Sequence, residues 1–209
     1  LSGLLNLGRL NRAFHHSDST GDYSMVADLL ADRPELAQKI SEGSFYESVH
    51  FFGEARSSFS AARNMLEDET FTGPAALFKP VLLERTSWVN ESQLYLRQRA
   101  QAMRSLENND FLRAALYGYE AYLSMKMRED RWYGTQVDNA DARQKFTEEF
   151  RENGSFKSPE EKQEYHFLRL LRNALAHGEH ALRKEIRPVV RDARELRARL
   201  RRALNVLLF

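Results

Sequence analysis

Residues 158–178 read SPEEKQEYHFLRLLRNALAHG and carry the signals of one complete helix. Ser158 is a good N-cap, Pro159 suits the first turn, and Glu161 completes a capping box with Ser158. The apolar residues that follow recur at threes and fours, which places them on one core-facing stripe. They are Tyr165, Leu168, Leu171 and Leu175. Gly178 marks the end, because glycine is the usual residue just past a helix. The stretch therefore predicts a long amphipathic helix.

Helical periodicity of this kind extends through almost the whole chain, and we find no alternation of apolar and polar residues typical of a β-strand. Further helical segments are predicted to start near Leu4 and Met25 and to cover 44–67, 75–89, 93–106, 109–127 and 189–208. The sequence therefore predicts an all-α protein. We divide it into an N-terminal helical segment, 1–43, and a helical domain, 44–209.

Three of these segments have a predicted buried face. Residues 44–67 are predicted to form one long helix that buries Phe45, Val49, Phe52, Phe59, Ala62 and Leu66. Residues 109–127 are predicted to bury Leu112, Leu116, Tyr119 and Leu123. The last helix is predicted to bury Leu196, Leu200, Ala203, Leu204 and Leu207.

The most hydrophilic stretch lies between Arg128 and Ser158. We interpret it as a solvated excursion with one short helix, as is usual for long polar connections. The alternative is a lid over a nucleic-acid substrate, in which Trp132 and Tyr133 stack on bases.

Composition limits the partners of the chain. The formal net charge of the 209 residues is only +1, so any nucleic-acid partner must be bound by a local cluster of basic residues. The chain has no cysteine, which excludes disulfides and thiolate sites and fits a cytoplasmic location. No signal peptide and no apolar run of about 20 residues is present, so we expect no membrane partner. Because the sequence starts at Leu1 inside an apolar-periodic stretch, we expect an N-terminal part to be missing.

The final turns of the helix at 158–178 carry three candidate catalytic residues. Arg172 has a permanent, forked positive charge that suits a phosphate, and Asn173 is a polar neighbour. His177 can give or take a proton near neutral pH. These residue types suffice to cleave an RNA phosphodiester without a metal. Five residues turn an ideal helix by about 140°, so Arg172 and His177 share a site only if the last turn distorts or a second chain contributes.

A second set of candidates consists of arginines. The last helix holds six arginines between residues 191 and 202. One interpretation is a solvated face with intrahelical ion pairs such as Glu195–Arg199, each worth a few tenths of a kcal/mol. The other is a sequence-independent contact with an RNA backbone that weakens steeply with salt. The residues predicted to bind RNA are Arg169, Arg194, Arg197 and Arg201.

The segment Arg172-Asn173-Ala174-Leu175-Ala176-His177-Gly178 resembles the Arg-x4-His signature of HEPN domains, helical proteins that are often ribonucleases. The preceding region is similar to the C-terminal effector part of CRISPR-associated CARF–HEPN proteins of type III systems. In particular, the Gly21-Asp22 turn followed by Ala27-Asp28-Leu29-Leu30 resembles the segment after their sensor domain. The chain has no alternating strand–helix region for such a sensor, and the missing N-terminal part would account for it.

The resemblance implies a HEPN-type helical bundle that acts in antiviral defence as a metal-independent endoribonuclease without a cofactor. It implies a homodimer with two copies of the motif at one composite site, and an upstream CARF sensor that binds cyclic oligoadenylate. By this analogy the 2′-hydroxyl of single-stranded RNA attacks the adjacent phosphorus. His177 would act as general acid or base, Arg172 would bind the phosphate, and Asn173 would orient one of them.

Two other functions remain open at this point. One is a HEPN toxin of a toxin–antitoxin pair, which would use the same chemistry. The other is a non-catalytic helical interaction module, in which Arg172 and His177 are structural. Two further hypotheses concern a metal pair and a buried ion pair. His177 and His180 could bind a metal, although Gly178 interrupts the helix between them, and Glu120 could be a buried acid paired with Arg172.

Overall fold

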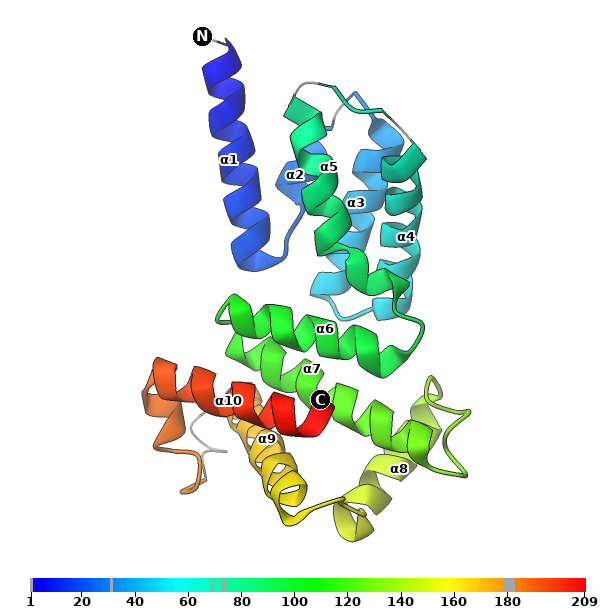
Figure 1. Cartoon of the computed structure of the whole chain (residues 1–209), viewed down its shortest axis with the longest axis vertical. Helices are drawn as coiled ribbons and strands as arrows, with labels where there is room; N and C mark the ends of the chain where they lie inside the picture. Colours follow the sequence, from blue (N-terminus) through cyan, green and yellow to red (C-terminus); the bar gives the residue numbers. More distant parts are fainter. Residues whose placement is uncertain (1, 31, 69, 73, 179–182) are drawn as a thin grey trace. The chain divides into compact units, whose positions relative to one another are not determined.

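The computed structural model describes residues 2–30, 32–68, 70–72, 74–178 and 183–209. These residues form helices and connections without a strand, so the predicted all-α class is confirmed (Figure 1). The chain divides into two compact units, residues 1–90 and 91–209. The boundary that we predicted between residues 43 and 44 is corrected, because it falls inside a helix of the first unit.

The first unit contains five α-helices and one short 3-10 helix in the described residues. They are α1 (Ser2–Thr20), α2 (Ser24–Asp28), α3 (Pro34–Ser48), α4 (Phe52–Asp68), α5 (Pro74–Arg85) and η1 (Ser87–Asn90). The centre of its core is aromatic, since Phe59 of α4 is fully buried and packs edge-on against Tyr23 and Trp88. Gly43 lets α3 approach α4 closely, because an added Cβ would lie 2.7 Å from the Phe59 ring.

The single helix predicted over 44–67 is wrong. The chain breaks at residues 49–51, where His50 takes a left-handed backbone conformation with φ of 65°, and α4 begins afterwards. The reversal leaves Phe45 and Val49 at the surface, with exposed fractions of 60% and 40%. Phe59, Ala62 and Leu66 are buried as predicted. The apolar spacing continues across the turn at residues 49–51, which contains neither glycine nor proline.

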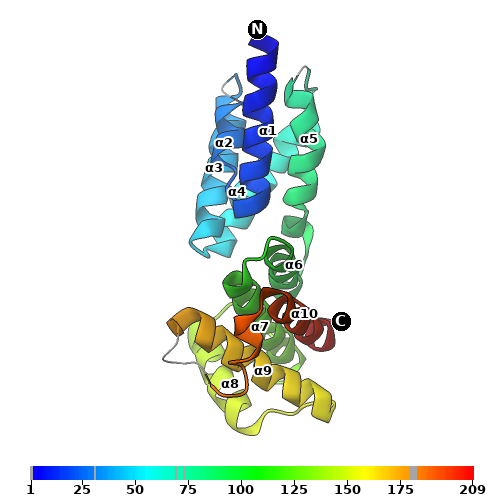
Figure 2. The same cartoon turned by 90° about the vertical axis from the view of Figure 1, so that its left-hand side faces the viewer.

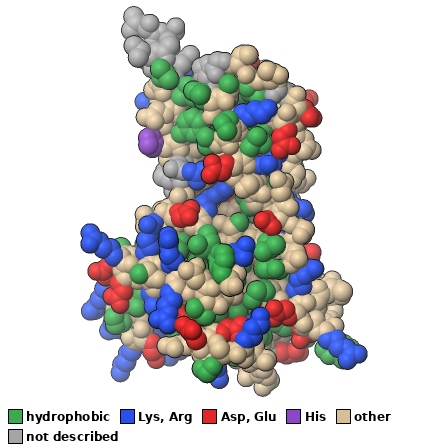
Figure 3. Space-filling model, in the orientation of Figure 1, with side chains coloured by type: hydrophobic (Ala, Val, Ile, Leu, Met, Phe, Trp, Pro, Cys, Tyr) green, Lys and Arg blue, Asp and Glu red, His purple; other side chains and the backbone are tan. Residues whose placement is uncertain are grey.

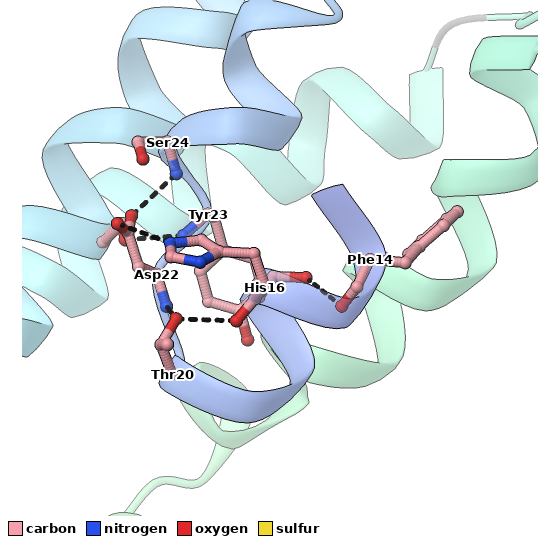
Figure 4. A network of polar contacts seen from close by, with 8 residues as sticks. Phe14, His16, Thr20, Asp22, Tyr23 and Ser24 are labelled. Atoms are coloured by element: carbon pink, nitrogen blue, oxygen red, sulfur yellow. Dashed lines mark hydrogen bonds and ion pairs between the residues drawn. The ribbon is translucent and has the colours of Figure 1, made fainter. Parts of the chain in front are cut away.

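A polar network joins α1 to the turn before α2 (Figure 4). The carboxylate of Asp22 accepts hydrogen bonds from the backbone N–H of Ser24 at 2.8 Å and from the hydroxyl of Ser44 at 3.2 Å. Its second oxygen lies 3.2 Å from Nε2 of His16. Burial alone would raise the pKa of Asp22, but these hydrogen bonds outweigh it and lower the pKa. The network fixes the turn that links the first two helices.

The second unit contains five α-helices and the 3-10 helix η3 in the described residues. They are α6 (Leu94–Glu107), α7 (Phe111–Glu129), α8 (Ala140–Asn153), α9 (Pro159–His177), η3 (Val189–Arg191) and α10 (Ala193–Leu208). Helix α7 is central and contacts α6, α9 and α10, as Figures 1 and 2 show. Gly118 lets α10 pack closely on α7, because an added Cβ there would overlap the Leu204 side chain.

The predicted buried faces of this unit are correct for α10 and only partly correct for α7. All five apolar residues predicted for α10 are buried. In α7, Tyr119 and Leu123 are buried, whereas Leu112 is 39% exposed and Leu116 is half-buried. The core-facing stripe of α7 instead includes the small residues Ala114 and Ala121, which let neighbouring helices approach.

The hydrophilic stretch forms turns and then α8, which is longer than the short helix we predicted. Trp132 is 75% exposed, and the hydroxyl of Tyr133 donates to Glu149 at 3.0 Å. Phe146 and Phe150 of α8 are buried, so this helix closes one side of the core. Within the described part of the chain, no helix has the length and apolar character needed to cross a membrane.

Candidate functional site

Helix α9 starts and ends where the sequence predicted. The hydroxyl of Ser158 accepts a hydrogen bond from the backbone N–H of Glu161 at 3.0 Å, and Pro159 occupies the first turn. Gly178 follows the last helical residue with φ of 69°, a conformation that favours glycine. Tyr165, Leu168 and Leu171 are buried, while Leu175 is half-buried. These two caps fix the turn of α9 that carries the candidate catalytic residues.

Two carboxylates in the N-terminal half of α9, those of Glu161 and Glu164, are buried and paired with cations. Glu161 lies 2.8 Å from the buried ammonium of Lys126 and accepts a hydrogen bond from the hydroxyl of Tyr122 at 3.1 Å. Glu164 is 1% exposed and pairs with Arg199 and, at 3.5 Å, with Arg202. These ion pairs hold α9 against α7 and α10.

The pKa of Glu161 is set by two opposing effects, burial and hydrogen bonding. Burial alone would raise the pKa of this carboxyl group, because a charge is poorly solvated there. Hydrogen bonds from the Lys126 ammonium, from the backbone N–H of Lys157 and from the Tyr122 hydroxyl outweigh that effect and lower the pKa below 4.5. Burial and the nearby Glu161 charge raise the pKa of Tyr122. Both groups therefore act as a fixed cluster whose charges do not change near neutral pH.

The C-terminal half of α9 carries cationic side chains and no carboxylate. The guanidinium of Arg172 lies over the ring of Tyr119 on α7, with its central carbon 4.8 Å from the ring centroid. It also donates a hydrogen bond to the side-chain oxygen of Asn173 at 3.3 Å. In the described part of the chain Arg172 pairs with no carboxylate, so its charge is held in place but not neutralised.

Tyr119 belongs to this site, although the sequence indicated only that it is buried. Its ring is 4% exposed and stacks on Tyr165 of α9, with ring centroids 5.9 Å apart. The Tyr119 ring therefore contacts both the Tyr165 ring and the Arg172 guanidinium. The hypothesis that Glu120 pairs with Arg172 is wrong, because Glu120 forms its ion pair with Arg143 of α8.

His177 is the last residue of α9 and is exposed. Among the contacts of the described residues it takes part in no hydrogen bond or ion pair, so the structure brings Arg172 and Asn173 together but does not join His177 to them. The predicted metal partner His180 lies outside the described residues. Across the described residues, no group of three or more His, Cys, Asp or Glu side chains is arranged to hold a metal ion.

The four arginines predicted to bind RNA have different environments. Arg194 and Arg201 are exposed. Arg169 is half-buried, and its Nε is buried without a hydrogen-bond partner in the described structure. Arg197 donates to the backbone oxygens of Leu106 and Glu107 at 3.0 and 2.6 Å, so it caps the C-terminus of α6. The predicted role of Arg197 is therefore replaced by a structural one.

The predicted intrahelical pair Glu195–Arg199 is also wrong, since Arg199 reaches Glu164 on α9 and lies over the Phe167 ring at 3.9 Å.

Comparisons of the chain with protein-family models, with curated proteins and with solved structures found no match. The case for a function therefore depends on the side chains of α9 and their surroundings.

Proposed function

We propose that this chain is a metal-independent endoribonuclease of HEPN type that cleaves single-stranded RNA and acts as a homodimer. The observation that carries the proposal is the state of Arg172. Its guanidinium is half-buried, held over Tyr119 and tied to Asn173, without a carboxylate partner among the described residues. A cation fixed in this way is suited to a phosphate, because forked N–H donors match phosphate oxygens.

In the proposed reaction a bond forms between the RNA 2′-oxygen and the adjacent phosphorus, and the bond from phosphorus to the 5′-oxygen breaks. The proton of the 2′-hydroxyl goes to a base and the leaving 5′-oxygen receives a proton, which are roles for the imidazoles of two His177 copies. Arg172 offsets the charge that develops on the phosphate oxygens, and Asn173 orients Arg172. The products are a 2′,3′-cyclic phosphate and a free 5′-hydroxyl.

A homodimer would bring Arg172 of one copy near His177 of the other, although the two residues point apart within one chain. Arg172 and His177 lie about 140° apart around an ideal helix, and no contact joins them among the described residues. The exposure of His177 at the end of α9 leaves it available to a second copy. Association is tested directly by the mass of the purified chain in sedimentation equilibrium.

The test is cleavage of a labelled single-stranded RNA by purified protein in the presence of EDTA. We expect the wild-type chain to cleave, and Arg172→Ala or His177→Ala to lower the rate by about 10²–10⁴-fold, the usual contribution of a general acid or base. Replacing the 2′-hydroxyl at the cleaved position by hydrogen should abolish the reaction at that position.

A matched control is Arg151→Gln, which removes an exposed arginine on α8. It should leave the rate unchanged within about twofold. The proposal is overturned if Arg172→Ala and His177→Ala fold like the wild type and degrade RNA at its rate, or if EDTA abolishes the activity.

A further inference from the structure

The C-terminal part of the second unit concentrates positive charge. Residues 183–202 hold nine basic and three acidic side chains, in a chain whose formal net charge is only +1. Figure 3 shows Lys and Arg side chains gathered over the segment before α10 and over the first turns of that helix. A local charge of this size attracts polyanions even though the chain as a whole is nearly neutral.

These basic residues fall into two classes. Three of them are used within the fold, since Arg197 caps α6 and both Arg199 and Arg202 pair with carboxylates of α9. The other six are exposed, and none of them forms an ion pair among the described residues. They are Arg183, Lys184, Arg187, Arg191, Arg194 and Arg201.

The exposed cations stand on a fixed backbone. Ile186 is fully buried and Val189 is 9% exposed, so two apolar anchors three residues apart hold the segment against the core. The backbone N–H groups of Ile186 and Arg187 donate to the carbonyl of Arg183, at 3.2 and 3.1 Å. Within α10, Arg194 and Arg201 are seven residues apart, which places them on one side of the helix and about 10 Å apart along it.

The surface suits a phosphate backbone better than a lipid headgroup layer. Every leucine of α10 is buried, so the helix has no apolar face to insert beneath headgroups, as interfacial helices require. Five of the six exposed cations are arginines, whose forked donors match phosphate oxygens.

The segment lies close to the candidate catalytic residues. Arg183 follows His177 by six positions, and an extended chain spans at most about 3.6 Å per residue, so their Cα atoms lie within about 22 Å of each other. We propose that the cations of residues 183–201 form a track that binds the phosphate backbone of single-stranded RNA and guides it toward His177. The guiding role and the choice of RNA as the ligand rest on the proposed ribonuclease function, whereas binding of a phosphate backbone does not.

The experiment compares two variants with equal loss of charge in RNA binding and in cleavage. The first is Arg183→Gln/Lys184→Gln/Arg187→Gln/Arg191→Gln, which neutralises the segment before α10. The control removes four exposed cations elsewhere in the same unit. It is Arg128→Gln/Lys145→Gln/Arg151→Gln/Lys162→Gln. Both are measured by fluorescence anisotropy with a labelled 20-nucleotide RNA across a series of KCl concentrations, in a His177→Ala background that prevents cleavage.

We expect the first variant to bind RNA at least about tenfold more weakly at about 0.1 M salt. The slope of log affinity against log salt should become shallower by about 0.7 for each RNA phosphate that the variant no longer neutralises. The control variant should change affinity less than about threefold. In the active chain, the first variant should raise KM without a matching loss of kcat.

Three results would overturn the binding track, and a fourth would overturn only the ribonuclease proposal. Equal weakening of both variants would mean that overall charge matters and the segment does not. Unchanged binding and KM in the first variant would remove the track but leave RNA cleavage standing. A wild-type chain that binds RNA through the segment but does not cleave it would remove the ribonuclease proposal and keep the track. Tighter binding to phosphatidylserine vesicles than to RNA would replace the nucleic acid by a membrane surface.

Discussion

The two halves of α9 both carry charged side chains, yet only the first half pairs them with opposite charges from other helices in the described structure. In the N-terminal half the carboxylates of Glu161 and Glu164 are buried, and each meets a cation from another helix. In the C-terminal half Arg172 and His177 face solvent at least in part and meet no opposite charge in the described structure. A neutralised charge joins helices, whereas a fixed charge without a partner can bind a substrate. The first half therefore serves the fold, and the second is where we place the proposed function.

The largest effect on stability is expected from the buried carboxylates in the N-terminal half of α9. Glu164→Gln should lower the free energy of unfolding by about 3 kcal/mol, because removing one partner of a buried ion pair leaves the other uncompensated. The measurement is urea denaturation followed by circular dichroism.

The matched control is Glu160→Gln, since Glu160 pairs with Arg202 on the surface at 2.9 Å. Exposed pairs contribute about 0–1 kcal/mol, so this change should have little effect. Similar losses for both variants would show that burial does not separate the two carboxylates.

A second prediction concerns acid and uses the lowered pKa of Glu161. A carboxyl group whose pKa is lower in the folded state stabilises the fold above its unfolded pKa, and this contribution is lost as the pH falls through the folded value. The stability difference between wild type and Glu161→Gln should therefore be largest near pH 7. It should shrink as the pH falls below 4.5.

The measurement is urea denaturation of both proteins at a series of pH values from about 7 to about 3, which brackets the range in which carboxyl groups titrate. A difference that stays constant over this range would contradict the assignment of Glu161 to the lowered pKa. The expected shrinkage would confirm that the N-terminal half of α9 holds its carboxylate in the charged form.

The smallest effect is expected at the functional end, where Tyr119 positions Arg172. Tyr119→Leu removes the ring under the guanidinium and should lower the single-turnover rate of RNA cleavage about tenfold, equivalent to about 1.4 kcal/mol. Tyr119→Phe keeps the ring and should stay within about twofold of wild type.

If Tyr119 had only a structural role, Tyr119→Leu would lower stability without a specific loss of cleavage rate. In an Arg172→Ala background, Tyr119→Leu should lower the rate no further, because the group that it positions is already absent. An equal additional loss in that background would show that Tyr119 does not act through Arg172.

Prediction from the sequence succeeded where the signal was local. Ser158 and Gly178 directly flank α9 and mark its two ends. The buried leucines of α10 recur at helical spacing. It failed at His50, because a left-handed residue other than glycine gives no sign in the pattern, and the apolar stripe ran on across the turn. It also placed Leu112 in the core, where the spacing fits but no neighbouring helix covers it fully.

The sequence by itself determined the helical class, the ends of α9 and the order of Arg172, Asn173 and His177, since each depends on residues within a few turns of one another. Only the tertiary structure decided which charges are used in packing. Arg197 and Arg201 look equivalent in the sequence, yet one caps α6 and the other remains exposed. Likewise, Tyr119 reaches Arg172 because α7 packs on α9. Partners of this kind lie far apart along the chain, and only packing brings them within hydrogen-bonding or stacking distance.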